Sequence, residues 1–176
     1  IEGDSIVLTI DSVLQSEVER SLEAAVKSSK AQSGSAVVMD ALTGEVWAMA
    51  NYPTYDPNHF YRYPVGDRRN RALTDLYEPG STMKIFTVGA GIEMNLLSLN
   101  KKLYCEAGRF KVGRHFIRES DPTKTWHWLT PEEIIKHSSN IGAVKIANRI
   151  GAKNLYSFIE RQDFRERTNI SLPGEV

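Results

Sequence analysis

The sequence has little of what several common kinds of functional site require. It contains one cysteine, Cys105, so no internal disulfide can form, and we expect this side chain to be a small buried one. The four histidines lack paired spacings such as H-E-x-x-H, and there is no C-x-x-C, so no metal site is predicted. A glycine-rich phosphate loop is also missing. The sequence therefore predicts neither a metal nor a cofactor.

Excess charge and long apolar runs are also missing. The chain has 22 Lys and Arg residues against 22 Asp and Glu residues, and no basic stripe is interleaved with aromatic residues. This balance argues against nucleic acid as a partner. No run of residues is apolar for long enough to cross a membrane. The apolar fraction of 41% and charged fraction of 25% are those of an ordinary globular protein.

Apolar residues are dense from Ser81 to Leu96, and they fall on nearly every side of the helix that this spacing predicts. Pro79 and Gly80 allow a sharp turn just before that helix. We expect the helix to be buried. Two polar side chains interrupt its first turns, Ser81 and Lys84, and residues at i and i+3 share one helix face.

A hydroxyl beside a buried amine favours a nucleophilic serine. Burial lowers the pKa of Lys84 toward a neutral amine, and such a base beside Ser81 suits an acyl-enzyme. The structural alternative is that Ser81 caps the helix and Lys84 extends to water. The pattern alone does not decide, because a second S-x-x-K occurs at Ser98 and Lys101, in a polar run.

The chain before this helix predicts a helix and a hairpin. Asp11 or Ser12 can cap a helix whose apolar spacing continues to Val26. Residues 35–40 and 45–50 predict two strands of a hairpin, and the proline-rich residues 51–71 predict a structured loop.

The chain after it predicts three more helices. Residues 95–129 show no sustained periodicity. Trp126 and Trp128 could lie in the core or line a cleft, and we expect the core. A Thr cap, a Pro and a Glu over residues 130–133 predict the start of a short helix. Apolar spacing predicts a second helix over residues 141–150, and a third is expected over residues 153–161.

Ser138, Ser139 and Asn140 fall at the junction between the first two of these helices. A side chain there can project into a cleft, where a hydroxyl can relay a proton. The alternative is that Ser139 or Asn140 only caps the following helix.

The S-x-x-K after a hairpin, followed by S-x-N between helices, resembles the penicillin-binding protein and serine β-lactamase superfamily. Longer stretches are similar to the transpeptidase domain of class B penicillin-binding proteins, nearest their division-specific septal branch. These stretches are residues 8–15, 39–58, 70–84 and 172–175.

The resemblance implies an α+β fold with helices around an incomplete antiparallel sheet. It implies a D,D-transpeptidase that cross-links peptidoglycan stem peptides and is acylated by penicillin. Ser81 would be the nucleophile, Lys84 would take its proton, Ser138 would pass a proton to the leaving group, and Asn140 would hold the lysine and the substrate amide.

The sequence departs from this family in one respect, since the third motif, K-[ST]-G, is missing. Residues 1–176 are therefore expected to be the N-terminal portion of the domain, inactive alone, with later strands and a membrane anchor outside this chain. The expected location is the periplasmic side of the bacterial inner membrane, and divisome proteins are expected partners. A β-lactam-binding sensor or scaffold and a serine β-lactamase are the alternatives.

Overall fold

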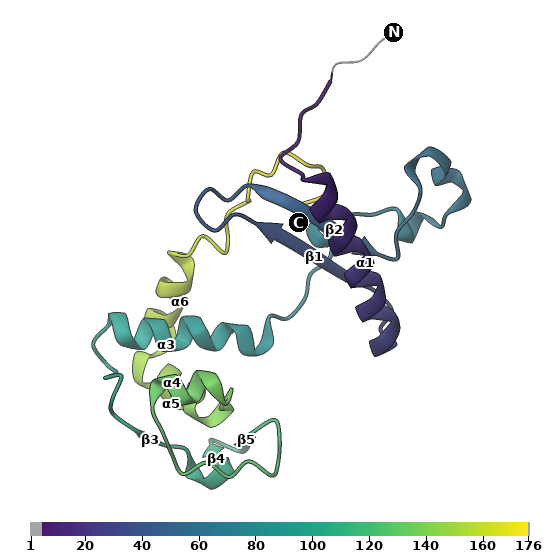
Figure 1. The fold of residues 1–176 in the computed structure, drawn as a ribbon. Coiled ribbons are helices and arrows are strands. Elements are labelled where there is room, and N and C mark those ends of the chain that lie inside the picture. Colours follow the sequence, from purple (N-terminus) through teal and green to yellow (C-terminus); the bar gives the residue numbers. More distant parts are fainter. Residues whose placement is uncertain (1–4, 176) are drawn as a thin grey trace. The chain divides into compact units, whose positions relative to one another are not determined.

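The computed structural model describes residues 5–175, which form two compact units. The first unit comprises residues 5–77 and 169–175, and the second comprises residues 78–168 (Figure 1). Within the described residues, no helix combines the length and apolar character needed to cross a bilayer.

The first unit is built on a hairpin and one long helix. Its elements are α1 (Ser12–Ser29), β1 (Gly34–Met39) and β2 (Val46–Tyr52), followed by two 3-10 helices (Pro57–Arg62 and Val65–Asp67) and α2 (Arg71–Thr74). Asp11 caps α1 by accepting from the Leu14 N–H at 2.8 Å, as predicted. The strands pair antiparallel with Ala36 opposite Ala50, which confirms the predicted hairpin.

A side chain of α1 extends the hydrogen bonding of this hairpin. The Gln15 amide accepts from the Met49 N–H at 2.7 Å and donates to the Met49 carbonyl at 3.0 Å. It therefore satisfies both backbone groups of one residue at the edge of β2, as a neighbouring strand would. Ala48 and Ala50 lie buried on that strand.

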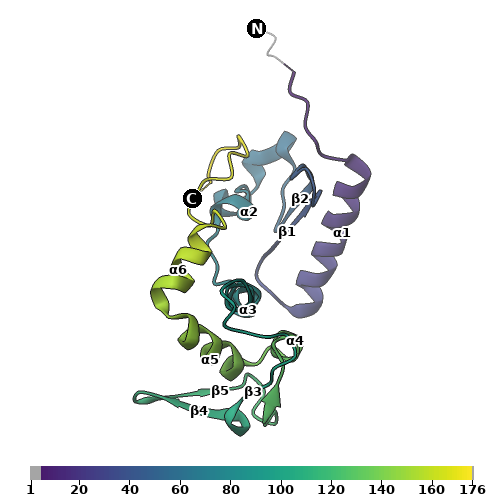
Figure 2. The same ribbon diagram turned by 90° about the vertical axis from the view of Figure 1, so that its left-hand side faces the viewer.

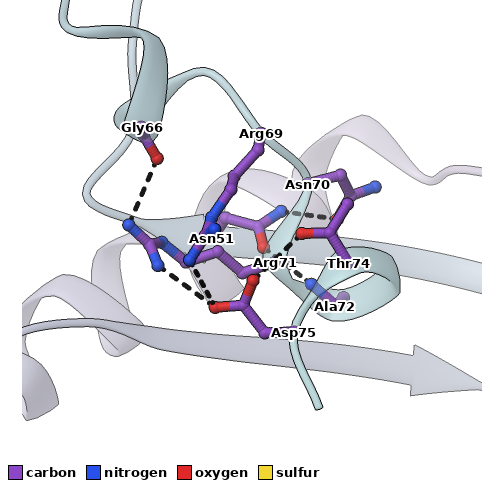
Figure 3. Close-up of polar contacts among 8 residues, drawn as sticks. All are labelled: Asn51, Gly66, Arg69, Asn70, Arg71, Ala72, Thr74 and Asp75. Carbon is purple, nitrogen blue, oxygen red and sulfur yellow. Dashed lines mark hydrogen bonds and ion pairs between the residues drawn. The ribbon is translucent and has the colours of Figure 1, made fainter. Parts of the chain in front are cut away.

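The loop that follows β2 is held by charged and amide side chains (Figure 3). The Asp75 carboxylate accepts from Arg69 at 3.0 Å and from Arg71 at 3.1 Å. The Asn51 side chain, on β2, accepts from the Ala72 N–H at 3.1 Å. The Asp75 bonds hold this segment together, and the Asn51 bond attaches it to the hairpin.

The second unit contains four helices and four short strands. Its helices are α3 (Met83–Glu93), preceded by a 3-10 turn (Gly80–Thr82), α4 (Pro131–Lys136), α5 (Asn140–Ile150) and α6 (Ala152–Glu160). Its strands are β3 (Leu103–Tyr104), β4 (Arg109–Val112), β5 (His115–Arg118) and β6 (Trp128–Leu129). Figures 1 and 2 show α5 beside α3, and α5 also contacts β5.

The helix boundaries follow the capping signals of the sequence. Thr130 and Glu133 form the predicted capping box at the start of α4, with Pro131 in the first turn. The Ser139 hydroxyl caps α5 by accepting from the Gly142 N–H at 3.0 Å. Gly151 ends α5 with a positive φ of 79°.

The α+β class is confirmed, although its strands were only partly predicted. Three two-stranded antiparallel sheets occur in the described residues, and the β4–β5 hairpin was not expected. Its strands are only four residues long, and its turn depends on Gly113 at a φ of 58°. The expectation of a core Trp128 is wrong, because in β6 the neighbouring Leu129 takes the inward position and leaves Trp128 59% exposed.

The core of the second unit lies where α3, α4 and α5 meet. Cys105 is fully buried there, as expected of a small apolar side chain, and burial raises the pKa of its thiol. The expected burial of α3 on every side is only partly observed. Val88 and Ala90 are buried, but Ile85 and Ile92 remain exposed because α4, α5 and α6 cover one side of the helix.

The close approach of α4 and α5 depends on Gly142, and we expect Gly142→Ala to destabilise the protein. A Cβ there would lie 2.6 Å from Cγ1 of Ile134, which is fully buried and cannot move aside. Such overpacking costs about 1–3 kcal/mol, which outweighs a helix-propensity gain of at most about 1 kcal/mol. Thermal unfolding measures the change. Gly66→Ala is the control, since its Cβ would meet nothing within 4 Å, and an equal effect of both variants would contradict the prediction.

Candidate active site

Ser81 lies at the beginning of α3, on the short 3-10 turn that precedes it. Gly80 adopts a φ of 56°, so the predicted sharp turn depends on a residue without a side chain. Ser81 is exposed and lies at the N-terminal end of this helical segment. A serine here is accessible to a substrate and lies where developing negative charge is stabilised.

The helix places Lys84 one turn further along, on the same face. Its Nζ lies 3.2 Å from the Ser81 Oγ. Partial burial lowers the pKa of the Lys84 ammonium, and the negative charge of Glu119 opposes that effect. A lysine in these surroundings is easier to deprotonate than one in water.

Ser138 approaches the same two groups from the junction between α4 and α5. Its Oγ donates to the Ser81 Oγ at 2.9 Å. Its carbonyl accepts from Lys84 Nζ at 2.6 Å, and its Oγ lies 2.9 Å from the same nitrogen. The backbone of Ser138 is left-handed, with a φ of 53°, which is uncommon for a residue other than glycine.

Asn140 completes the group around the amine. Its Oδ1 accepts from Lys84 Nζ at 2.6 Å. Its Nδ2 donates to the Arg118 carbonyl at 2.9 Å and lies 3.3 Å from the Ser120 hydroxyl. The four residues proposed from the sequence therefore lie within one hydrogen-bonded cluster in the second unit.

The acceptors around Lys84 can accommodate a neutral amine as well as an ammonium. A neutral amine has two N–H donors and one lone pair, and the Ser138 carbonyl and Asn140 Oδ1 are acceptors that occupy both donors. The lone pair is then left for a hydroxyl, and Ser81 lies within reach. The arrangement can thus accept a proton from a serine at the start of a helix.

Glu119 is part of this arrangement, and the sequence did not indicate it. It is only 8% exposed, and its carboxylate accepts from the Ser139 hydroxyl and the Asn140 N–H, both at 2.6 Å. In the sequence it stands in a polar run, Arg118 to Asp121, that gives no sign of burial. Its hydrogen-bond partners, Ser139 and Asn140, are about 20 residues further along the sequence, so no local pattern indicates the contact.

A pocket of about 180 Å³ lies beside this cluster and shares Ser138 and Glu119 with it. Its remaining lining residues are Ser120, Asp121, Lys124, Trp126 and His137. The Trp126 and His137 rings stack with centroids 4.3 Å apart. Trp126 is partly buried against the core, as expected, and it also lines this pocket, whereas Trp128 is exposed.

The second S-x-x-K pattern has none of this geometry. Ser98 and Lys101 are both exposed and lie around a turn after α3, where the Lys101 N–H donates to the Ser98 carbonyl. The two copies therefore share the S-x-x-K pattern but differ in the sequence around it and in their tertiary surroundings.

Comparison with known proteins supplies independent evidence. The family model described as the penicillin binding protein transpeptidase domain matches residues 34–176. The probable peptidoglycan D,D-transpeptidase PenA of Neisseria gonorrhoeae is 36% identical over 99% of this chain, which covers 29% of that protein. The peptidoglycan D,D-transpeptidase FtsI of Escherichia coli is 36% identical over 97% of this chain, which covers 28% of that protein.

Solved structures are similar over almost the whole chain. One is the apo transpeptidase domain of penicillin-binding protein 3 from Burkholderia pseudomallei, with a TM-score of 0.82 and 31% identity over 99% of this chain. Another, described as a peptidoglycan glycosyltransferase from Burkholderia ambifaria, has a TM-score of 0.83 and 34% identity over 97% of this chain. This chain covers 47% and 49% of those two chains, respectively. It thus spans less than half of these structures and less than a third of the curated relatives named above.

Proposed function

Because this chain belongs to the penicillin-binding protein transpeptidase family, we propose that it supplies the acylating serine of a peptidoglycan D,D-transpeptidase. The membership bears out the resemblance to class B penicillin-binding proteins found in the sequence. The observation that carries the proposal is the cluster around Lys84, with Ser81 Oγ at 3.2 Å and Ser138 Oγ at 2.9 Å from its Nζ.

In the proposed first step, neutral Lys84 takes the Ser81 proton and Oγ attacks the carbonyl of a D-Ala–D-Ala bond. The negative charge that forms on the carbonyl oxygen is stabilised by the Ser81 N–H at the start of the helix and by a second N–H, expected on a strand outside this chain. The C–N bond then breaks, and the proton passes from Lys84 through Ser138 to the departing amine. The product is an ester between Ser81 and the stem peptide.

In the second step the amine of another stem peptide attacks this ester. Lys84, neutral again after the first step, takes a proton from that amine, and Ser81 regains its proton as the C–O bond breaks. Asn140 holds the lysine throughout with its Oδ1, and its Nδ2 donates to the substrate amide in place of its contact with the Ser120 hydroxyl. With penicillin the first step opens the lactam ring and the leaving amine stays attached, so the ester persists.

This function implies partners and a location. The substrates would be peptidoglycan stem peptides that end in D-Ala–D-Ala, with β-lactams as inhibitors. Cross-linking these peptides belongs to the periplasmic face of the inner membrane, and divisome proteins and a membrane anchor outside this chain would keep the enzyme there. No metal or cofactor is required by the steps above.

Labelling with a fluorescent penicillin tests the proposal. We expect a protein that carries this chain and extends to the length of its relatives to acquire a stable label, and peptide mass mapping should place it on Ser81. The same protein should transfer D,D-peptides, whereas the chain alone should do neither. Rapid loss of the label would indicate a β-lactamase, and a stable label without peptide transfer would indicate a sensor, so either result would contradict the transpeptidase proposal.

A further inference from the structure

We propose that Glu119 is a positioning residue for this reaction, because its carboxylate fixes the turn at Ser139 and Asn140 that presents acceptors to Lys84. The inference rests on the proposed function and adds to it a residue that touches neither the nucleophile nor the base. Glu119 acts through the backbone and side chains of its partners.

Both carboxylate oxygens of Glu119 are used in this turn. Oε1 accepts from the Ser139 hydroxyl and Oε2 accepts from the Asn140 N–H, each at 2.6 Å. Hydrogen bonds to an ionised carboxylate are shorter and stronger than those between neutral groups. Because Glu119 is only 8% exposed, water competes little for these bonds.

The turn requires such support because its first residue is strained. Ser138 has a φ of 53°, and a residue with a Cβ keeps that conformation only when its surroundings impose it. In this conformation both the carbonyl and the Oγ of Ser138 reach Lys84 Nζ, at 2.6 and 2.9 Å. Glu119 holds the two residues that follow Ser138 and so fixes the end of the turn.

The neighbours of Glu119 set the orientation of the Asn140 amide. Nδ2 of Asn140 donates to the Arg118 carbonyl at 2.9 Å and lies 3.3 Å from the Ser120 hydroxyl. Since both contacts lie on the Nδ2 side, Oδ1 is left facing Lys84. Arg118, Glu119 and Ser120 together therefore hold the backbone and side chain of Asn140 in the orientation that the amine needs.

Glu119 also acts on Lys84 through its charge. Its carboxylate raises the pKa of the Lys84 ammonium and opposes the larger effect of burial. Asp121, Lys124 and His137 line the pocket beside Glu119 and Ser138 and are the other charged or titratable groups there. Removal of the Glu119 charge should therefore lower the pKa of Lys84, and acylation should begin at a lower pH.

A purely structural role is the competing explanation. A carboxylate near the start of α5 stabilises that helix by itself, and its loss would then reduce only stability. The two roles differ in the pH profile of acylation, which a role confined to stability leaves unchanged.

The experiment uses the same extended protein as the penicillin-labelling test. It measures the second-order rate constant of acylation by a labelled penicillin from acid to alkaline pH. We expect Glu119→Ala to lower that rate about 100-fold, as misplaced catalytic groups do. Glu119→Gln keeps the size of the side chain and should cause a smaller loss, with the midpoint of the pH profile moved to lower pH. Glu106→Gln is the matched control, since Glu106 pairs with Lys145 in the same unit, and it should leave both quantities unchanged.

Several results would overturn the inference. One is a folded Glu119→Ala variant whose acylation rate equals that of the wild type. Another is a Glu119→Gln variant whose pH profile of acylation has the wild-type midpoint and whose only change is a lower unfolding temperature. If Glu119→Ala fails to fold, Ser139→Ala replaces it, because it removes one of the two bonds to Glu119 and retains the Asn140 N–H bond. Wild-type protein that does not label at all would instead count against the proposed function itself.

Discussion

Ser81→Ala is expected to abolish covalent labelling by penicillin and peptide transfer, with a loss in rate of at least about 10⁴-fold. Alanine has no side-chain oxygen with which to form the ester. The fold should survive, because Ser81 is exposed and alanine is favourable at the start of a helix. Fluorescence on a denaturing gel and intact mass measure the label, and thermal unfolding checks the fold.

Ser98→Ala provides the matched control for this variant. It removes the serine of the other S-x-x-K pattern, which is exposed in a turn and has no comparable contacts with the cluster. We expect it to label at the wild-type rate. Equal labelling of Ser81→Ala would show that the nucleophile is misassigned.

A weak residual label on Ser81→Ala would have one obvious origin. The Ser138 Oγ lies 2.9 Å from Lys84 Nζ, so loss of Ser81 leaves a second hydroxyl beside the same base. Peptide mapping distinguishes the two serines. A label on Ser138 that formed as rapidly as the wild-type label would contradict a dedicated role for Ser81.

Local sequence predicted those parts of the site that depend on helix geometry. Ser81 and Lys84 are three residues apart, and the turn of a helix alone brings them together. The capping box at Thr130 and Glu133 is likewise a local signal, and it set the start of α4 correctly. Where two interacting residues are three or four positions apart, the local pattern of residue types is enough to predict the contact.

Tertiary packing determines the rest of the site. Ser138 and Asn140 lie 54 and 56 residues from Lys84, and the sequence alone left open that Ser139 or Asn140 only caps the following helix. Ser139 does cap that helix, whereas its neighbours Ser138 and Asn140 contact Lys84. Only the resemblance to a known family favoured the chemical one beforehand.

Glu119 shows why a buried polar group is harder to predict. A charged residue in a polar run resembles a surface residue, and its burial depends on donors supplied by Ser139 and Asn140. The β4–β5 hairpin that leads to it has strands too short to show clear alternation. The segment that supports the site was therefore the part least accessible to sequence analysis.

Lys84→Arg is expected to lower the acylation rate about 10³-fold while the protein stays folded. A guanidinium keeps its proton at every accessible pH, so it cannot take one from Ser81. It still carries a positive charge and donors for the Ser138 carbonyl and Asn140 Oδ1. The variant therefore removes the base and retains the positive charge. Labelling with penicillin measures the acylation rate, and thermal unfolding measures whether the fold is retained.

The pH dependence separates a base from a merely positive group. If Lys84 is the base, the wild-type rate rises with pH as the ammonium loses its proton. Because burial lowers the pKa of Lys84, that rise should occur below the pH at which an exposed lysine titrates. Lys84→Arg should lack the rise, and Lys101→Arg, at the exposed second S-x-x-K, should retain it. A wild-type rate that falls over this range, or an arginine variant with the wild-type profile, would mean that Lys84 acts through its charge and that another group accepts the proton.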